Sequence, residues 1–547
     1  MSGTDIKSGG DMPHESNSIE AKDVAIGDVA SIDEKSDLDW MDPKEQKLRR
    51  DLGARQIFMI SLGTAIGTGL WIGSGSALAK GGPAGLWLGF TIVGFMVLVF
   101  VQSLGEMATL FPVPESFTLF ATRFVDPSVG VGLGWLYWVD RTLTIPTEFV
   151  AANIVIQYWT EQVPVAAWLA IFMVLTFSIN YMGVRAYGES EFIFTSIKVT
   201  AIIVFIIIGI VIAAGGAPDH EYLGFHYWYD PGSFAHGFKG FLSVLITATF
   251  SYGGIELTAI VAGETSNPTR NVPKAIRSVF IRLCMFYMVG TLIVSIIVPY
   301  TNKQLLGGSE TNASPFVIAF KDHGLAGLSH LMNAIILISA LSCGSSAVYA
   351  SSRVLAGLGR LGIAPRFVAK TDKYGRPYWG IIIATVLGGG LSFLNISDTG
   401  AEVFSWFSSL VGLGHTLEWI TILITSLRFR AGWKASGYSP KDLPYCGPIL
   451  FPWSVYFAIL IGILIVISKF YLSIWPLGDE QSAATFFSNF ISVPLYLILI
   501  LGYKLIVRPK FVRASEMDVV SGQRVVRDGK PEERAWWQTI FAYFIWA

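Results

Sequence analysis

Two apolar segments of this chain are interrupted by clusters of small residues. The first cluster reads Gly63-Thr64-Ala65-Ile66-Gly67-Thr68-Gly69, and the second reads Ser251-Tyr252-Gly253-Gly254. Glycine weakens a helix, and a broken backbone at membrane depth is tolerated only where it lines a cavity or contacts other protein. Four unbroken apolar segments separate the two breaks, so they take matching positions in two possible repeats, which favours a transporter with its substrate site between them. The alternative is that the small residues only let helices pack closely.

The composition indicates a protein embedded in a membrane. Hydrophobic residues make up 52% of the chain and charged residues 14%, the mean hydropathy is +0.54, and the formal net charge is -1. This balance predicts neither nucleic acid nor a strongly charged partner. The cysteines Cys284, Cys343 and Cys446 are far apart and two of them lie in apolar segments, so the sequence predicts no disulfide framework and no metal site.

Apolar runs of about 20 residues predict an all-α integral membrane protein with about twelve transmembrane helices. An even number of spans places both termini on the same side of the membrane. The predicted spans are 56–78, 86–110, 130–158, 164–182, 190–214, 238–262, 279–299, 329–356, 379–395, 402–427, 452–475 and 484–507.

Basic residues are concentrated in one set of loops, whereas the opposite loops hold scattered lysines and no arginine. Loops rich in lysine and arginine stay in the cytoplasm, so both termini are predicted to be cytoplasmic. The clusters precede the first predicted span and follow the sixth, eighth and tenth: Lys44, Lys47, Arg49, Arg50 and Arg55; Arg270, Lys274 and Arg277; Arg360, Arg366, Lys370, Lys373 and Arg376; and Arg428, Arg430 and Lys434.

Polar or short segments flank the transmembrane domain, which is predicted to cover residues 51–508. Residues 1–50 are rich in Ser, Asp, Glu and Lys, which predicts a disordered cytoplasmic tail. Phosphorylation or ubiquitination machinery is a possible partner there, and a plain solvated tail is the alternative. Residues 509–547 form a second cytoplasmic tail. Its aromatic residues between 534 and 544 repeat at near-helical spacing, which predicts a short amphipathic helix lying on the membrane or on the protein.

The sequence contains no motif for covalent chemistry. The glycines between Gly67 and Gly73 have the wrong spacing for a dinucleotide loop and lie in a predicted span, and no P-loop is present. We therefore predict no enzymatic activity and no cofactor. Transport would be secondary, driven by an ion gradient or by the substrate alone.

A series of motifs resembles those of fungal amino acid permeases, in the same order and over roughly residues 50–510. They are Gly63 to Gly73, Gly81-Gly82-Pro83-Ala84-Gly85, Gly105-Glu106-Met107-Ala108, Pro112, Pro146-Thr147-Glu148, Asn180, Tyr187-Gly188-Glu189, Glu191-Phe192, Ile197-Lys198-Val199, Gly254-Ile255-Glu256, Glu264-Thr265-Ser266-Asn267-Pro268, Pro273-Lys274-Ala275-Ile276, Ala313-Ser314-Pro315-Phe316 and Ser351-Ser352-Arg353.

This resemblance implies a place in the amino acid/polyamine/organocation superfamily. The expected fold has two inverted five-helix repeats, at about 56–214 and 238–427, followed by two extra helices at about 452–507. Spans one and six would each open a repeat, so that their breaks face each other near the bilayer midplane. The implied activity is import of amino acids across the plasma membrane by alternating access.

An amino acid suits a site built from two helix breaks. Its carboxylate can accept hydrogen bonds from N–H groups around Gly67, Thr68 and Gly69, at the positive end of a half-helix, and its ammonium can meet carbonyls around Phe250, Ser251 and Tyr252. Phe250 and Tyr252 are also candidate walls or gates, with interior packing as the alternative. The neighbouring candidates in the two breaks are Thr64, Ala65 and Gly253.

Ionisable residues inside the predicted spans need a role or a partner. Lys198 is similar in position to a lysine that, in proton-coupled relatives, occupies the place of a sodium ion and can lose its proton; the alternative is a lysine that snorkels to the cytoplasmic surface. Glu148 and Glu256 are candidates for proton coupling. We therefore expect a proton gradient as the driving force.

His415 and Glu418 lie three residues apart and share one helical face. The position of Glu418 departs from the family, where a small or weakly polar residue is usual. A carboxylate facing the cavity would favour a cationic side chain or assist proton transfer, whereas one facing another helix would pair with His415. Two other functions stay open: a receptor that senses amino acids with the same fold, and a permease for polyamines or choline-like amines.

Overall fold

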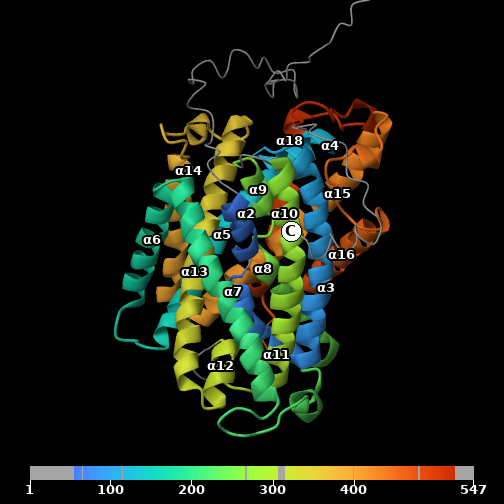
Figure 1. Cartoon of the computed structure of the whole chain (residues 1–547). Helices are drawn as coiled ribbons and strands as arrows, with labels where there is room; N and C mark the ends of the chain where they lie inside the picture. The colour runs from blue at the N-terminus through green and yellow to red at the C-terminus, as the bar shows by residue number, and fades with distance from the viewer. Residues whose placement is uncertain are drawn as a thin grey trace, which may run out of the picture.

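The computed structural model of the protein consists of long helices that run side by side (Figure 1). It describes residues 54–64, 66–113, 115–264, 268–305, 314–397, 399–478 and 481–523. The predicted tail at residues 1–50 and the predicted helix between 534 and 544 lie outside these ranges, as does Ala65. Within the described residues every regular element is helical, which confirms the prediction of an all-α fold.

The α-helices are α2 (Ala54–Gly63), α3 (Ser74–Leu110), α4 (Ser116–Phe124), α5 (Pro127–Gln157), α6 (Val165–Tyr181), α7 (Val184–Ala213), α8 (Gly237–Tyr252), α9 (Leu257–Ala262), α10 (Pro268–Arg282), α11 (Gly290–Ile297), α12 (Pro315–Asp322), α13 (Ala326–Arg360), α14 (Tyr378–Leu391), α15 (Gly400–Ala435), α16 (Trp453–Ile474), α17 (Ala483–Phe490) and α18 (Ser492–Val507). Short π-helices are η1 (Gly69–Gly73), η2 (Trp228–Gly232) and η3 (Leu283–Val289), and short 3-10 turns are η4 (Arg366–Ala369), η5 (Ser392–Ile396), η6 (Pro440–Asp442) and η7 (Ala514–Glu516).

Seven described helical segments are long and apolar enough to cross a membrane, and three shorter apolar helices accompany them. By length and composition they support a multi-pass membrane protein, while the number twelve stays a prediction. The segments and the predicted spans differ for local reasons. The first predicted span is broken, so its first half, α2, has only ten residues. Its second half continues into the second predicted span within one helical stretch, Gly69–Leu110.

Gly82 makes the bend that separates those two spans. Its φ of 74° is in the left-handed region, and a Cβ there would lie 2.5 Å from the backbone nitrogen of Ala235. The Ala84 N–H donates to the Ser233 carbonyl, and the Ala235 N–H donates to the Gly81 carbonyl. These bonds tie the bend to the segment that leads into α8, which is the helix that α3 packs against.

Helix α5 lies at the centre of the packing, against both α13 and α15. It is 31 residues long and carries the buried charged residues Asp140, Arg141 and Glu148. Helix α2 packs against α7 and α10. Helix α8 packs against α3, α15 and α16. The polar side chains at the two breaks, described below, come from α5, α7, α13 and α15.

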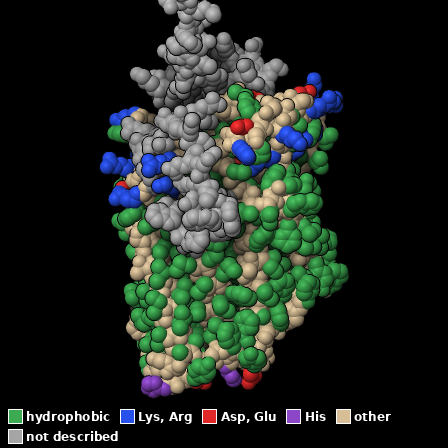
Figure 2. Space-filling view, turned by 45° about the vertical axis from the view of Figure 1, so that its right-hand side comes forward, with side chains coloured by type: hydrophobic (Ala, Val, Ile, Leu, Met, Phe, Trp, Pro, Cys, Tyr) green, Lys and Arg blue, Asp and Glu red, His purple; other side chains and the backbone are tan. Residues whose placement is uncertain are grey.

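Lysine and arginine side chains gather at one end of the molecule, beyond a wide apolar band, and the opposite end shows Asp, Glu and His side chains (Figure 2). Three carboxylates near the basic end are held by arginines: Glu106 by Arg430, Glu264 by Arg353, and Glu115 by Arg360. The segment 509–523, which follows α18, starts at this end, where the Val512 N–H donates to the Val125 carbonyl. The distribution matches the asymmetry of basic loops in the sequence.

Candidate functional site

The two predicted breaks lie against each other. Helix α2 ends at Gly63 and α8 ends at Tyr252, and the hydroxyl of Thr64 donates to the Gly254 carbonyl across 3.1 Å. A Cβ on Gly69 would lie only 2.5 Å from the Cα of Ser251. A side chain at residue 69 would therefore push the breaks apart, which explains the glycine at this position.

Helix α13 supplies hydrogen bonds to the first break. The hydroxyl of Ser339 donates to the Ile66 carbonyl at 2.7 Å, and the thiol of Cys343 lies 3.5 Å from the Thr64 carbonyl and 3.4 Å from that of Ile66. These groups satisfy carbonyls that the interrupted helix leaves free, as a buried backbone requires. Cys343 thus makes two polar contacts with the first break.

A small cavity lies beside the two breaks. Eight residues predicted for the site line it: Thr64, Gly67, Gly69, Glu148, Phe250, Ser251, Gly253 and His415. The other described lining residues come mainly from α5 and α13: Tyr137, Arg141, Thr144, Gly254, Leu257, Cys343, Ser346, Ala347 and Ala350. The cavity is therefore polar along the breaks and along one face of α5.

Two carbonyls of the second break and the side chain of Tyr252 have partners within the protein. The Ser251 carbonyl accepts a bond from the Tyr287 hydroxyl at 2.8 Å, and the Phe250 carbonyl accepts one from the Gly253 N–H. The Tyr252 hydroxyl donates to the Phe90 carbonyl, and its ring lies 4.1 Å from that of Tyr287. The structure thus places the Tyr252 side chain against α3 and η3, away from the described cavity lining.

Lys198 is fully buried next to the end of α2. Its ammonium group donates to the Gly63 carbonyl at 3.2 Å and to the Ser342 hydroxyl at 2.9 Å. The Ser342 hydroxyl in turn donates to the Glu191 carboxylate at 2.8 Å. The alternative of a lysine that snorkels to the surface is wrong, because no part of the side chain is exposed. The cation sits at the carbonyl end of α2, which is the negative end of a helix dipole.

Glu148 projects from α5 toward the first break. Its carboxylate lies beside the hydroxyl and the backbone N–H of Thr68, and a Cβ on Gly67 would be 3.1 Å from its Oε1 atom. The Thr68 N–H, one of those predicted to receive a substrate carboxylate, therefore already faces a carboxylate of the protein. Thr68 itself does not belong to the described lining of the cavity.

Glu256 fixes the second break through a backbone bond. Its Oε1 atom accepts from the Gly254 N–H at 3.1 Å and lies 3.3 Å from a guanidinium nitrogen of Arg141. Arg141 also pairs with Asp140 at 3.0 Å. Arg141 thus joins two carboxylates, one on α5 and one at the break, and its side chain reaches the cavity.

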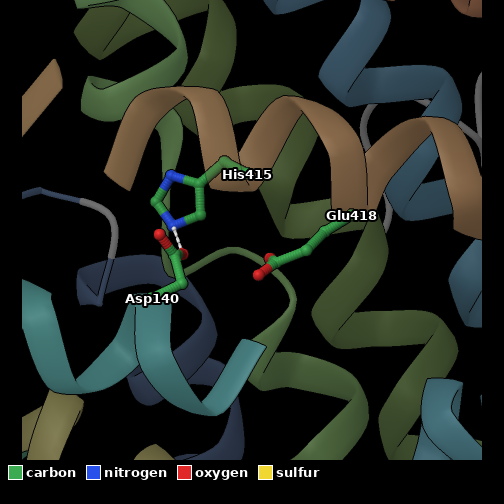
Figure 3. Close-up of side chains that lie close together, drawn as sticks. All are labelled: Asp140, His415 and Glu418. Carbon is green, nitrogen blue, oxygen red and sulfur yellow. Dashed lines mark ion pairs between the residues drawn. The ribbon is translucent and has the colours of Figure 1, made fainter. Parts of the chain in front are cut away.

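His415 and Glu418 of α15 face Asp140 of α5 (Figure 3). The Nε2 atom of His415 lies 2.8 Å from the Asp140 carboxylate, and a Cβ on Gly253 would be 1.9 Å from the His415 ring. Glu418 points toward the same carboxylate but has no hydrogen-bond partner among the described residues. The expected alternative, a pair between His415 and Glu418, is therefore replaced by a pair between His415 and Asp140.

Sequence reasoning missed Asp140 and Arg141, and it named Glu191 only as part of a family motif, not as a site residue. All three are charged residues inside predicted spans, at 130–158 and 190–214, and this was a signal that could have found them. Their partners, in contrast, are not visible in the sequence. Arg141 and Glu256 lie 115 positions apart, and His415 is farther still from Asp140.

A second, larger cavity adjoins the first, and Phe250 lines both. The Phe250 ring makes an edge contact with that of Phe404 at 5.8 Å. The larger cavity lies at the end of α15 where the helix begins, near Thr399 and Ala401, and is opposite the end that carries Arg428 and Arg430. We call it the vestibule.

These features define a membrane transporter of helical fold. In a search of solved structures the chain is similar to a manganese transporter of Eremococcus coleocola, with a TM-score of 0.52 and 13% identity over 85% of this chain and 98% of that one. At this identity the likeness shows the fold alone. The metal that the Eremococcus coleocola protein transports is therefore no evidence for the substrate of this chain.

The chain belongs to the amino acid permease family, whose model matches residues 56–516. It is 40% identical to the Candida albicans amino-acid permease GAP5 over 94% of this chain and 83% of that protein. It is 40% identical to the tryptophan permease of Saccharomyces cerevisiae over 84% and 77%, and 39% identical to the general amino-acid permease GAP1 of that yeast over 88% and 81%. The family is one of transporters, and the protein is not an enzyme.

Proposed function

We propose that this permease imports amino acids across the plasma membrane as a proton symporter that works by alternating access. The observation that carries the proposal is the position of Glu148. Its carboxylate faces the Thr68 N–H at the break where the carboxylate of an amino acid would bind. Two ionised carboxylates repel each other at such short range, so the substrate is accepted when Glu148 carries a proton.

Lys198 supports the same proposal from the other end of the break. Its ammonium group holds the Gly63 carbonyl and is linked through Ser342 to Glu191. A lysine held by neutral ligands in a buried site can change its protonation, and a change would release the end of α2. Glu148 and Lys198 thus connect the proton to the two sides of the substrate-binding break, and Glu256 holds the second break through Gly254.

We also propose an orientation and a path. Basic loops at the end of α15 that carries Arg428 and Arg430 support a cytoplasmic location for that end and for both termini. The vestibule then opens to the outside, and Phe250 separates it from the inner cavity. In this reading the substrate passes Phe250 before it reaches the breaks. The inverted repeats and the twelve spans belong to the same proposal.

Uptake of labelled amino acids by permease-deficient yeast tests the proposal. The cells express the wild-type chain, Glu148→Gln, Lys198→Ala or, as a control, Glu161→Gln in the exposed loop after α5. We expect uptake to be greater at acidic than at neutral external pH in the wild type and in the control. Glu148→Gln and Lys198→Ala should lose uptake or its pH dependence.

Other outcomes would contradict the proposal in distinct ways. Uptake that is equal at both pH values in the wild type would exclude proton symport while leaving amino acid transport intact. An amino acid signal without uptake would support a receptor. Uptake of polyamines or choline in place of amino acids would show that recognition of a carboxylate is not required.

A further inference from the structure

Five ionisable residues form a buried cluster between α5, α15 and the second helix break. They are Asp140, Arg141, Glu256, His415 and Glu418, and each is less than one-tenth exposed. Three of them are carboxylic acids, whereas Arg141 is the one arginine. The cluster therefore contains more acids than permanent cations. Buried carboxylates need a cation or a proton to offset the loss of water.

The pairing within this cluster is uneven. Arg141 contacts Asp140 and Glu256, and His415 contacts Asp140. Glu418 is 1% exposed, and both of its oxygen atoms lack a hydrogen-bond partner among the described residues. Its carboxylate nevertheless points into the cluster, toward Asp140 (Figure 3). With all three carboxylic acids ionised the cluster carries excess negative charge, which one more positive charge at Glu418 would reduce.

Other groups near the cluster do not supply that charge. Tyr137 of α5 lies near Glu256 and Tyr496 of α18 near Glu418, and the Tyr496 hydroxyl is bonded to Thr421. Arg282 of α10 donates to the carbonyls of Ser61 and Leu62 and acts electrostatically on Glu256 rather than on Glu418, and Lys198 lies at Gly63 beside α13. The charged groups that act on Glu418 are thus Asp140, Arg141 and Glu256.

The cluster contacts the cavity through His415 and Arg141. His415 lines the cavity and packs on Gly253, while its Nε2 atom contacts Asp140. A proton can therefore reach the cluster from the cavity by way of the imidazole, whose two ring nitrogens can each bind a proton. A change at Glu418 can also reach the second break, because His415 packs on Gly253 and lies on the same face of α15 as Glu418.

We propose that Asp140, His415 and Glu418 form a second proton-binding site of the transport cycle, separate from Lys198 and Glu148. This inference rests on the proposed proton symport. Glu418 accepts one proton when the substrate is loaded and releases that proton after the substrate has left, with no other covalent bond made or broken. The protonated carboxyl donates to Asp140 and joins α15 to α5, whereas the ionised form repels Asp140 and loosens the contact.

The guanidinium of Arg141 favours a proton over a metal ion at this site. It lies 3.0 Å from the same Asp140 oxygen that contacts His415, so a divalent ion bound there would sit next to a fixed positive charge. The three side chains do, however, bring one ligand atom each within 4.8 Å of one another. Metal binding is therefore an outcome that the experiment has to distinguish.

The test counts protons in liposomes that contain the purified permease and an internal pH-sensitive dye. The labelled amino acid best transported by the wild type is the probe, and proton entry is measured per molecule taken up. We expect Glu418→Gln to carry one proton fewer per substrate than the wild type. Glu418→Asp keeps a carboxylate and should retain the wild-type ratio, and Glu161→Gln is the matched control.

Each other result has a defined meaning. An unchanged ratio in a folded, active Glu418→Gln variant would overturn the second site and leave proton symport standing, and Asp140→Asn repeats the test if Glu418→Gln does not fold. Transport without any proton entry in the wild type would overturn the symport proposal itself. Stoichiometric zinc or manganese in the purified wild type that is lost in Glu418→Gln would replace the proton with a metal ion.

Discussion

The buried charges of this permease fall into two regions that differ in how they are balanced. At the end of the molecule rich in basic residues, each oxygen of Glu106 lies 2.5 Å from a nitrogen of Arg430, and the Gly447 N–H also donates to this carboxylate. Around the cavity, Lys198 is held by neutral oxygens and Glu418 has no hydrogen-bond partner among the described residues.

The difference separates charges that hold the fold from charges that can change. A carboxylate in a two-pronged pair with arginine keeps its ionised form, because both its charge and its hydrogen bonds are satisfied. A lysine or carboxylate without such a partner can exchange a proton at little structural cost. We therefore expect substitutions in the first region to reduce stability, and substitutions around the cavity to reduce coupled transport.

Breaking the Glu106 pair should have the largest effect. Arg430→Met leaves Glu106 buried without its cation, and removal of one partner from a buried pair costs about 3–5 kcal/mol of folding free energy. We expect a large loss of folded protein at the cell surface and a lower thermal stability in detergent. The double variant Glu106→Leu with Arg430→Met should recover part of the loss. A single variant as stable as the wild type would remove the distinction between the two regions.

Replacing Lys198 should affect transport more than stability. Lys198→Met removes the cation from the end of α2. Lys198 has no ion-pair partner within 4 Å among the described residues, so the substitution leaves no directly paired carboxylate without its cation. We expect uptake to fall roughly tenfold or more, since coupling between two sites is typically worth about 1–3 kcal/mol. Thermal stability should fall by less than in Arg430→Met. Equal losses in stability would mean that Lys198 is structural.

Glu418→Gln should leave stability unchanged or raise it slightly. The amide has no charge to desolvate, and the ionised carboxylate that it replaces makes no described hydrogen bond. Thermal unfolding of the purified variant, followed beside that of Arg430→Met, measures the difference. A loss as large as that of Arg430→Met would indicate that Glu418 has a structural partner and would weaken the comparison.

Asp219→Asn should have the smallest effect on transport. Asp219 lies in the loop between α7 and α8, where the hydrogen bond with His323 holds its pKa below the ordinary value. The pair contributes stability above the pKa of about 3.9 of an unfolded aspartate and loses it as the pH falls through the lower folded value. Asp219 therefore stays ionised between mildly acidic and neutral pH. The variant should keep the wild-type pH dependence of uptake, and a changed profile would place a pH-sensitive group outside the cavity.

Part of the site was predictable because it depends on local sequence. Glycine clusters weaken a helix wherever it packs, so the ends of α2 at Gly63 and of α8 at Tyr252 fall at the predicted breaks. The candidates that line the cavity come mostly from these breaks. The outward turn of Tyr252 was not predictable, because its partners Phe90 and Tyr287 belong to other helices.

The sequence by itself determined a helical membrane protein of the amino acid permease family, with two broken helices and with charges inside its spans. The lengths of apolar runs, the glycine clusters and the order of the motifs are properties of the sequence itself, so they can be recognised before the packing is known. The tertiary structure alone decided that Arg141 joins Asp140 to Glu256, that His415 pairs with Asp140, and that Glu418 stays without a described partner. Partners of this kind depend on how α5 and α15 are rotated against each other, and one residue of rotation turns a side chain from a neighbouring helix toward lipid.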